Sequence, residues 1–176
     1  MQRSLIIYNM KLKSPTRKTL MQFIMVILAI FVIRTWQQQD LTVGMVPSFT
    51  SKTLSGNIVN SKPLPKQAVL VHFWATWCGI CGLENDNIQA LNGKDYRVLN
   101  IAMQSGTDTE LKQYAQEHNM RLDNIINDNS GALARLFGVR ATPSSFFINP
   151  EGRIQFVEVG YVTTLGYRLR LWWATL

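Results

Sequence analysis

The chain has 176 residues, of which 47% are hydrophobic, so it is long enough for one ordinary domain with its own core and a short appendage. Its formal net charge of +7 would suit a nucleic-acid ligand, but the excess lies at one end, because residues 1–39 contain six Lys and Arg side chains and no acidic residue. The remaining basic and acidic residues nearly balance. We therefore expect no nucleic-acid partner.

The first apolar run predicts a membrane-spanning helix. Leu20 to Ile33 contains one polar residue, Gln22; extended over residues 19–36, the run would form about 27 Å of helix. Basic residues precede it, so we expect residues 1–18 in the cytoplasm, residues 19–36 as an uncleaved signal anchor and the rest of the chain across the membrane. A cleaved signal peptide, a buried core helix and a start at Met10 are alternatives.

Residues 37–46 are predicted to form a linker, and residues 47–176 a folded domain. In that domain, apolar runs bounded by caps and turn residues predict alternating strands and helices. Strands are expected at 68–75, 97–102, 144–148 and 153–159, and helices at 79–91, 107–119, 130–137 and 165–175. This order favours an α/β domain with a mixed sheet.

Local signals support several of these boundaries. Thr107 and Glu110 have the spacing of a capping box. Ser130 is expected to cap the third helix and Gly138 to end it. The sequence NPEG predicts the turn of a β-hairpin. The last helix carries apolar residues on one side, so it is expected to pack on the sheet or, alternatively, to rest against a bilayer; these residues are Leu165, Leu169 and Trp172 or Trp173.

The stretch FWATWCGIC, residues 73–81, contains the only two cysteines. It joins a buried strand to a helix, so Cys78 is expected at the helix N-terminus, where free backbone amides favour a thiolate. Cys81 lies one turn further in and is expected to be shielded and able to resolve a mixed disulfide. Trp77 would give a flat apolar surface beside the sulfur. The pair Cys78–Cys81 is thus predicted to be redox-active.

Other uses of the pair remain open at this point. A structural disulfide closing so short a loop would remove little chain entropy. A zinc site would need His72 and His118, which lie too far apart in sequence for the usual ligand spacing. A module that binds Cu(I) through the two sulfurs is the main alternative, since thiolates select soft metals. A redox-inert scaffold is a third class.

A proline near a predicted strand adds a second feature. In RATPSSFFI, Pro143 would remove a ladder hydrogen bond, so we expect a cis Thr142–Pro143 bond in a loop beside the dithiol. With the WCxxC motif and the NPEGR hairpin, the chain resembles the thioredoxin superfamily. VLVHFWATWCGIC and FGVRATPSSFFINPEGRI are similar to the membrane-anchored TlpA/ResA/DsbE-like group, and within it to suppressor-of-copper-sensitivity thioredoxin-like proteins.

The resemblance implies a thioredoxin fold, a mixed sheet flanked by helices with an N-terminal β-hairpin extension and a βα insertion over residues 98–119. It implies a bacterial periplasmic thiol-disulfide oxidoreductase at the inner membrane, with Cys78 as nucleophile, Cys81 as resolving thiol, and Thr142 and Pro143 against the substrate backbone. No cofactor and no metal are implied. Expected partners are protein thiols or disulfides, such as apocytochrome c or proteins damaged by copper, and a DsbD/CcdA-like membrane electron carrier as reductant.

The chain departs from thioredoxins at two positions. Ile80 replaces the usual proline before the second cysteine, so the direction of electron flow does not carry over. His72 replaces a buried acid, and an imidazole beneath Cys81 would suit proton transfer; a core histidine is the alternative. Glu84 matches an acid of the group and is a second candidate for proton handling, with a solvated helix face as the favoured alternative.

Overall fold

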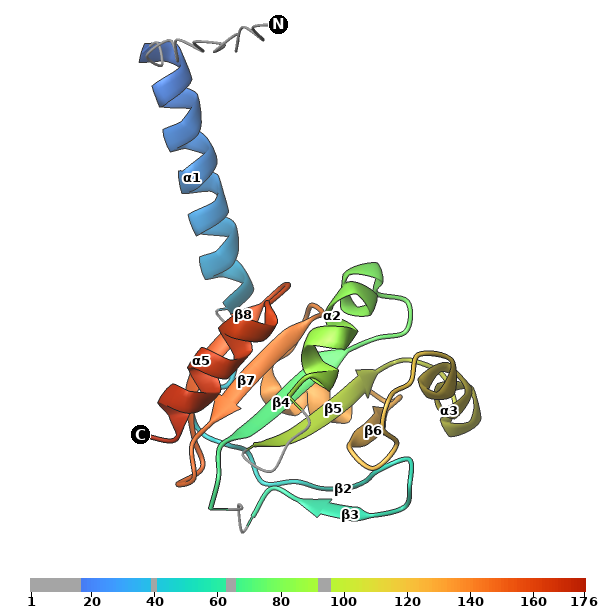
Figure 1. Cartoon of the computed structure of the whole chain (residues 1–176). Coiled ribbons are helices and arrows are strands. Elements are labelled where there is room, and N and C mark those ends of the chain that lie inside the picture. The colour runs from blue at the N-terminus through green and yellow to red at the C-terminus, as the bar shows by residue number, and fades with distance from the viewer. Residues whose placement is uncertain (1–16, 39–40, 63–65, 92–95) are drawn as a thin grey trace, which may run out of the picture. The chain divides into compact units, whose positions relative to one another are not determined.

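The computed structural model describes residues 17–38, 41–62, 66–91 and 96–176 (Figure 1). Residues 1–16, with most of the predicted cytoplasmic segment and the alternative start at Met10, lie outside the described residues, as do residues 39–40 of the predicted linker. The elements follow in the order α1 Arg17–Gln38, β1 Gly44–Met45, β2 Thr50–Lys52, β3 Ile58–Asn60, β4 Val69–Trp74, α2 Gly79–Gln89, β5 Arg97–Met103, α3 Asp108–Glu117, β6 Ile125–Asp128, α4 Ala132–Phe137, β7 Ser144–Ile148, β8 Arg153–Val159 and α5 Thr164–Ala174.

The predicted N-terminal helix is present as α1, which forms a unit separate from the rest of the chain. Side chains of residues 23–28 are exposed and apolar, and six consecutive residues cover every side of a helix because about 3.6 complete a turn. The side chains at 30, 31 and 34–38 lie outside the described set. Within that set, no helix combines the length and the apolar character needed to cross a membrane, so the predicted span over residues 19–36 is not confirmed.

The second unit is built on a six-stranded mixed sheet with the order β1-β8-β7-β4-β5-β6. Strand β4 is parallel to β5 and antiparallel to β7, and β7 continues antiparallel into β8. All six residues of β4 are buried, as its continuous apolar run predicts for a strand covered on both faces. The prediction of an α/β domain with a thioredoxin-type mixed sheet is confirmed.

Helices cover both faces of this sheet (Figure 1). On one face, Leu70 of β4 packs in a cluster with Ile88 of α2 and Leu171 of α5. On the other face, Phe73 packs in a cluster with Phe137 of α4. Because successive strand residues point to opposite faces, the apolar run of β4 serves both layers. The end of β4 therefore lies in a well-packed region, and the cysteine pair follows it directly.

The predicted N-terminal hairpin forms from β2 and β3, which pair antiparallel as a separate two-stranded sheet. The residues just before it behave differently from the prediction. Gly44–Met45 pair with the start of β8, and Leu41 and Val46 are buried in the core. The folded domain therefore begins before Pro47, inside the segment predicted as a linker over residues 37–46.

Strand β6 was absent from the sequence-based prediction. It is only four residues long, IIND, and half of them are polar, so it has no alternation to detect. It is held by tertiary pairing: β6 runs parallel to β5, Leu54 donates its backbone N–H to the Ile125 carbonyl, and Thr53 bridges Ile126. The hairpin region thus lies against the outer edge of β6.

Helix capping was predicted correctly for α3 and for the end of α4, and incorrectly for the start of α4. Thr107 and Glu110 form the capping box of α3, and Gly138 ends α4 with a left-handed φ of 71°. The Ser130 hydroxyl, however, reaches only the Ala132 amide at 3.3 Å. The carboxylate of Asp128, at the end of β6, instead accepts the amides of residues 133 and 134 at 3.1 and 2.8 Å.

The last helix packs through the side opposite to the one expected. Tyr167, Leu171 and Ala174 of α5 are buried. The apolar side that was expected to pack is exposed; it consists of Leu165, Leu169, Trp172 and Trp173. The buried side includes a tyrosine whose hydroxyl has polar partners inside the domain, and such a partner is needed when a tyrosine is buried.

We predict that Asp128→Ala lowers the free energy of unfolding by about 1–3 kcal/mol, because one part-buried and one buried amide at the start of α4 lose their acceptor. Urea unfolding followed by tryptophan fluorescence would measure the change. Ser130→Ala is the matched control and should alter the free energy by less than about 0.5 kcal/mol, since that side chain is exposed. Equal losses in the two variants would contradict the capping role of Asp128.

Candidate active site

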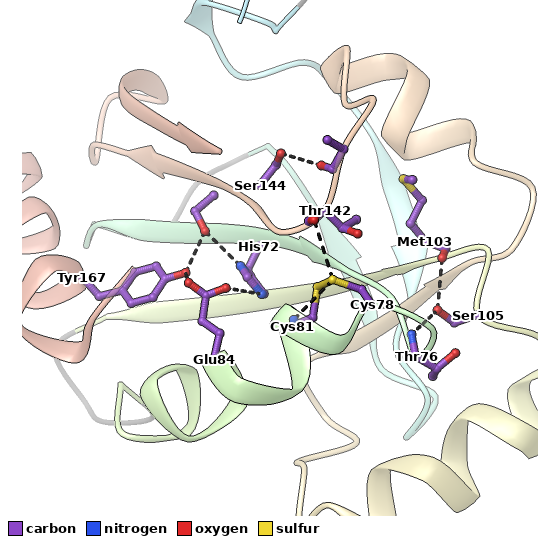
Figure 2. The surroundings of a disulfide bond; sticks show 12 residues. His72, Thr76, Cys78, Cys81, Glu84, Met103, Ser105, Thr142, Ser144 and Tyr167 are labelled. Carbon is purple, nitrogen blue, oxygen red and sulfur yellow. Dashed lines mark hydrogen bonds and ion pairs between the residues drawn. A yellow bond between two sulfur atoms is a disulfide. The ribbon is translucent and has the colours of Figure 1, made fainter. Parts of the chain in front are cut away.

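The two cysteines are joined by a disulfide at the start of α2 (Figure 2). Cys78 is the N-cap of this helix, with extended backbone angles, and its Sγ accepts the N–H of Cys81 at 3.3 Å. Cys78 is half-buried, whereas Cys81 is 4% exposed. An incoming sulfur can therefore reach Cys78 more readily than Cys81.

The electrostatic setting of Cys78 favours negative charge on its sulfur. The free amides at a helix N-terminus carry partial positive charge, and one of them already points at Sγ. The first turn of α2 contains no acidic residue that would oppose this charge. In the reduced protein, the same geometry stabilises a thiolate, which is the nucleophile in disulfide exchange.

The loop before β7 lies beside the Cys78 sulfur. The Thr142–Pro143 peptide bond is cis, as predicted. The carbonyl oxygen of Thr142 lies 3.7 Å from Cys78 Sγ (Figure 2). Pro143 is buried, and its own carbonyl accepts the N–H of Gly160. The predicted substrate-contacting loop and the predicted nucleophile are thus brought together.

Exposed apolar side chains lie close to Cys78 in the sequence. Trp77 is 62% exposed, and Ile80 and Leu83 of α2 are 50% and 74% exposed. The indole of Trp77 is held in place because its Nε1 donates to the carbonyl of Gln104 at 3.1 Å. The Ser105 hydroxyl supports the same loop by accepting the backbone N–H of Thr76. Sequence reasoning missed these two supports, since they come from the distant end of β5.

Both candidates for proton handling are buried behind the disulfide. His72 is 3% exposed and lines a pocket of about 10 Å³ together with Cys81. Glu84 is fully buried, so the favoured expectation of a solvated helix face is wrong. Its spacing to Cys81 and Ile88, three and four residues away, could have indicated the inner face of α2. Glu84 Oε2 lies 3.9 Å from His72 Nε2.

Burial disfavours the charged form of both members of this pair. Desolvation lowers the pKa of His72 from 6.5 to about 3, so the ring is uncharged at neutral pH. Desolvation raises the pKa of Glu84, against the opposing effect of hydrogen bonds from the Val162 amide and the Tyr167 hydroxyl. A 3.9 Å approach between an uncharged ring and a carboxyl group is too long for a hydrogen bond, and it is not a salt bridge.

Metal binding gains no further ligands from the structure. In the part of the chain that the structure describes, no group of three or more His, Cys, Asp and Glu side chains could hold an ion. His118 is the C-cap of α3, and its ring contacts that of Tyr114.

Comparison with known proteins places these features in a family. The model of the AhpC/TSA family matches residues 44–157. A thioredoxin-like protein of Haemophilus influenzae is 25% identical over 94% of this chain and 98% of its own. The thiol-disulfide oxidoreductase ResA of Oceanobacillus iheyensis is 26% identical over 80% and 78%. The thiol:disulfide interchange protein DsbE of Pseudomonas fluorescens is 32% identical over 69% and 68%.

Among solved structures, a thioredoxin-family thiol:disulfide interchange protein from Chlorobium tepidum superposes with a TM-score of 0.65. It shares 23% sequence identity, and the match covers 77% of this chain and 98% of that one. At this level of identity the likeness concerns the fold, and it agrees with the sheet and helix arrangement described above.

We predict that His72→Asn reduces the fall in the free energy of unfolding as the pH is lowered. Between pH 6.5 and about 3 the unfolded wild type binds a proton at His72 that the folded state does not, so its free energy of unfolding falls as pH falls. The raised pKa of Glu84 acts oppositely, lowering stability as pH rises above 4.5. Urea unfolding at several pH values measures the slope. His118→Asn is the control, and an unchanged slope in His72→Asn would contradict the burial of an uncharged ring.

Proposed function

The chain belongs to the AhpC/TSA family and is a thiol-disulfide oxidoreductase of the ResA/DsbE type; we propose that it reduces protein disulfides, with Cys78 as nucleophile and Cys81 as resolving thiol. One observation carries this proposal. A half-buried Cys78 caps α2 beside the cis-proline loop, with Cys81 buried directly behind it.

The proposed reaction has two exchange steps. The Cys78 thiolate attacks one sulfur of the partner's disulfide, so a mixed disulfide forms and the other partner sulfur leaves as a thiolate that takes a proton from solvent. Cys81 then loses its proton and attacks Cys78 Sγ. The Cys78–Cys81 bond forms, the second partner thiolate leaves, and two electrons have passed to the partner. The disulfide in the structure is the product of this half-cycle.

The proposed partner is an extended polypeptide segment. It would run beside Thr142 and Pro143, in the manner of an added strand, with its cysteine facing Cys78. The exposed surfaces of Trp77, Ile80 and Leu83 would contact apolar side chains next to that cysteine. No cofactor takes part in this scheme, because the two sulfurs carry both electrons.

His72 and Glu84 are proposed to handle the proton of Cys81. His72 lines the pocket that Cys81 also lines, and Glu84 Oε2 is the nearest carboxyl oxygen to the ring. A general base inside the domain is needed because Cys81 is shielded from water. This supports a role for both residues in the second step rather than in the attack by Cys78.

Electron supply and substrates form a further part of the proposal. A periplasmic reductant must be recharged, so we assign a DsbD/CcdA-like membrane carrier as electron donor and apocytochrome c or copper-damaged proteins as substrates. The support is the similarity to ResA and DsbE. In acid-quenched cells, alkylation should find Cys78 and Cys81 mostly reduced. A mostly oxidised pair would contradict the proposal and indicate that electrons flow from the partner to this chain.

We also propose that residues 19–36 hold the chain in the bacterial inner membrane, with the domain in the periplasm. The support is the apolar run of Leu20 to Ile33, the basic residues before it and the exposed apolar side chains of α1. Carbonate extraction should leave the full chain in the membrane pellet. A variant with Ile27→Asp and Leu28→Asp should be released. Complete extraction of the wild type would contradict an anchor.

We predict that Cys81→Ser accumulates covalent complexes with partner proteins, because the mixed disulfide on Cys78 cannot be resolved. Non-reducing gels of cells that express the full chain would show bands that vanish with dithiothreitol. Cys78→Ser is the matched control and should show none. A variant that weakens Cu(I) binding and traps no partner would support the copper alternative instead.

A further inference from the structure

Four buried side chains form a closed circuit of polar contacts next to the disulfide (Figure 2). Ser145 Oγ lies 2.9 Å from His72 Nδ1 and 2.9 Å from the Tyr167 hydroxyl. Tyr167 donates to Glu84 Oε1 at 2.9 Å, and Glu84 Oε2 faces His72 Nε2 at 3.9 Å. All four residues are at most 3% exposed. The function proposed above uses two of them and leaves Ser145 and Tyr167 without a role.

The circuit is built from three distant parts of the chain. His72 of β4 and Ser145 of β7 are directly paired in the antiparallel register, so their side chains share one face of the sheet. Glu84 lies on the inner face of α2, and Tyr167 on the buried face of α5. A buried serine between two bulkier polar groups is suited to pass a hydrogen bond from one to the other, since a hydroxyl both donates and accepts.

The number of available hydrogens fixes the direction of the circuit. Glu84 Oε1 already accepts the Val162 N–H at 2.6 Å, so it is an acceptor for Tyr167 as well. The single hydrogen of Tyr167 is then committed to Glu84, and Ser145 must donate to the Tyr167 oxygen. The single hydrogen of Ser145 is thereby committed too. His72 must therefore carry its hydrogen on Nδ1 in order to donate to Ser145.

With the hydrogen bonds in this direction, no hydrogen lies between His72 Nε2 and Glu84 Oε2. An uncharged ring with hydrogen on Nδ1 has a lone pair on Nε2. Glu84 Oε2 is buried and has no hydrogen-bond partner, and a 3.9 Å gap to Nε2 is too long for a direct hydrogen bond. His72 also lines, together with Cys81, a small pocket inside the domain. Nε2 and Oε2 are thus two acceptors that share room for one exchangeable proton.

We propose that Ser145 and Tyr167 are positioning residues that fix the Nδ1–H tautomer of His72 and the orientation of Glu84, so that the proton leaving Cys81 is received between Nε2 and Oε2. This inference rests on the proposed function, of which it deepens the second exchange step. Cys81 loses that proton as its sulfur bonds to Cys78, and the partner's sulfur leaves with the electron pair of the mixed disulfide. The histidine and glutamate pair receives the proton and then releases it to solvent, so the ring of the oxidised protein is again uncharged.

The tautomer can be measured without any substrate. In the oxidised full chain labelled with ¹⁵N-histidine, the ring nitrogens of His72 should show hydrogen on Nδ1 and none on Nε2, with His118→Gln used to assign the signals. Tyr167→Phe frees the hydrogen of Ser145 to donate to Nδ1, and Ser145→Ala removes the acceptor. Both variants should shift His72 toward the Nε2–H form. A wild-type Nε2–H ring, or unchanged tautomers in both variants, would overturn the proposal.

The kinetic test separates the two exchange steps. In Tyr167→Phe and Ser145→Ala, reduction of insulin disulfides by the reduced full chain should slow by about tenfold near neutral pH, less than the roughly 10²–10⁴-fold contribution of a complete acid-base catalyst. The deficit should shrink at higher pH, where solvent base removes the Cys81 proton. Capture of substrate by Cys78, measured in a Cys81→Ser background, should be unchanged. Slowing of both steps alike would indicate a merely structural effect and overturn the proposal.

Matched controls and neighbouring charges complete the design. Tyr161→Phe removes a hydroxyl bonded to Asn87, outside the circuit, and Ser61→Ala removes a buried hydroxyl in the hairpin region; both should behave as wild type. The other titratable groups nearby are Tyr114, which lines the pocket, and Arg170, which contacts Glu158. Absence of insulin reduction by the wild type would defeat the proposed function, whereas the tautomer result would still decide the circuit.

Discussion

The site depends on one local event, the start of a helix directly after the central strand of the sheet. Because β4 is buried on both faces and α2 begins at Gly79, Cys78 has extended backbone and an amide pointing at its sulfur. The same helix geometry then places Cys81, Glu84 and Ile88 on one inner face. Nucleophile, resolving sulfur and internal carboxyl group thus follow from where a single helix begins and which of its faces packs on the sheet.

Strand β7 supplies the rest of the site from the opposite direction. It enters the sheet immediately after the cis Thr142–Pro143 bond and pairs antiparallel with β4. Its first residues therefore lie beside the end of β4 where the cysteines follow, and Ser145 lies opposite His72. The cis-proline loop and Ser145, the hydrogen-bonding partner of the histidine, follow one another in the chain, so a shift in the register of β7 would displace both together.

The parts of the site that the sequence predicted are those encoded locally. An apolar run, a Cys-x-x-Cys and a helix follow one another within a few residues. At position 143, the proline residue itself restricts the backbone, which can be read from the sequence. Tyr167 and Ser145 carry no such signal, because a tyrosine in an amphipathic helix and a serine in an apolar strand are ordinary. Their contacts arise from strand register and from which side of α5 packs, and β6 was missed for a similar reason.

The hairpin formed by β2 and β3 has a consequence for the solubility of the domain. Strand β6 ends the main sheet, and an uncovered end strand offers free backbone groups to any other extended chain, a common origin of edge-to-edge aggregation. The backbone hydrogen bond from Leu54 to Ile125 and the bridge between Thr53 and Ile126 cover part of the outer edge of β6. The domain thereby keeps this edge of its own sheet from pairing with another extended chain.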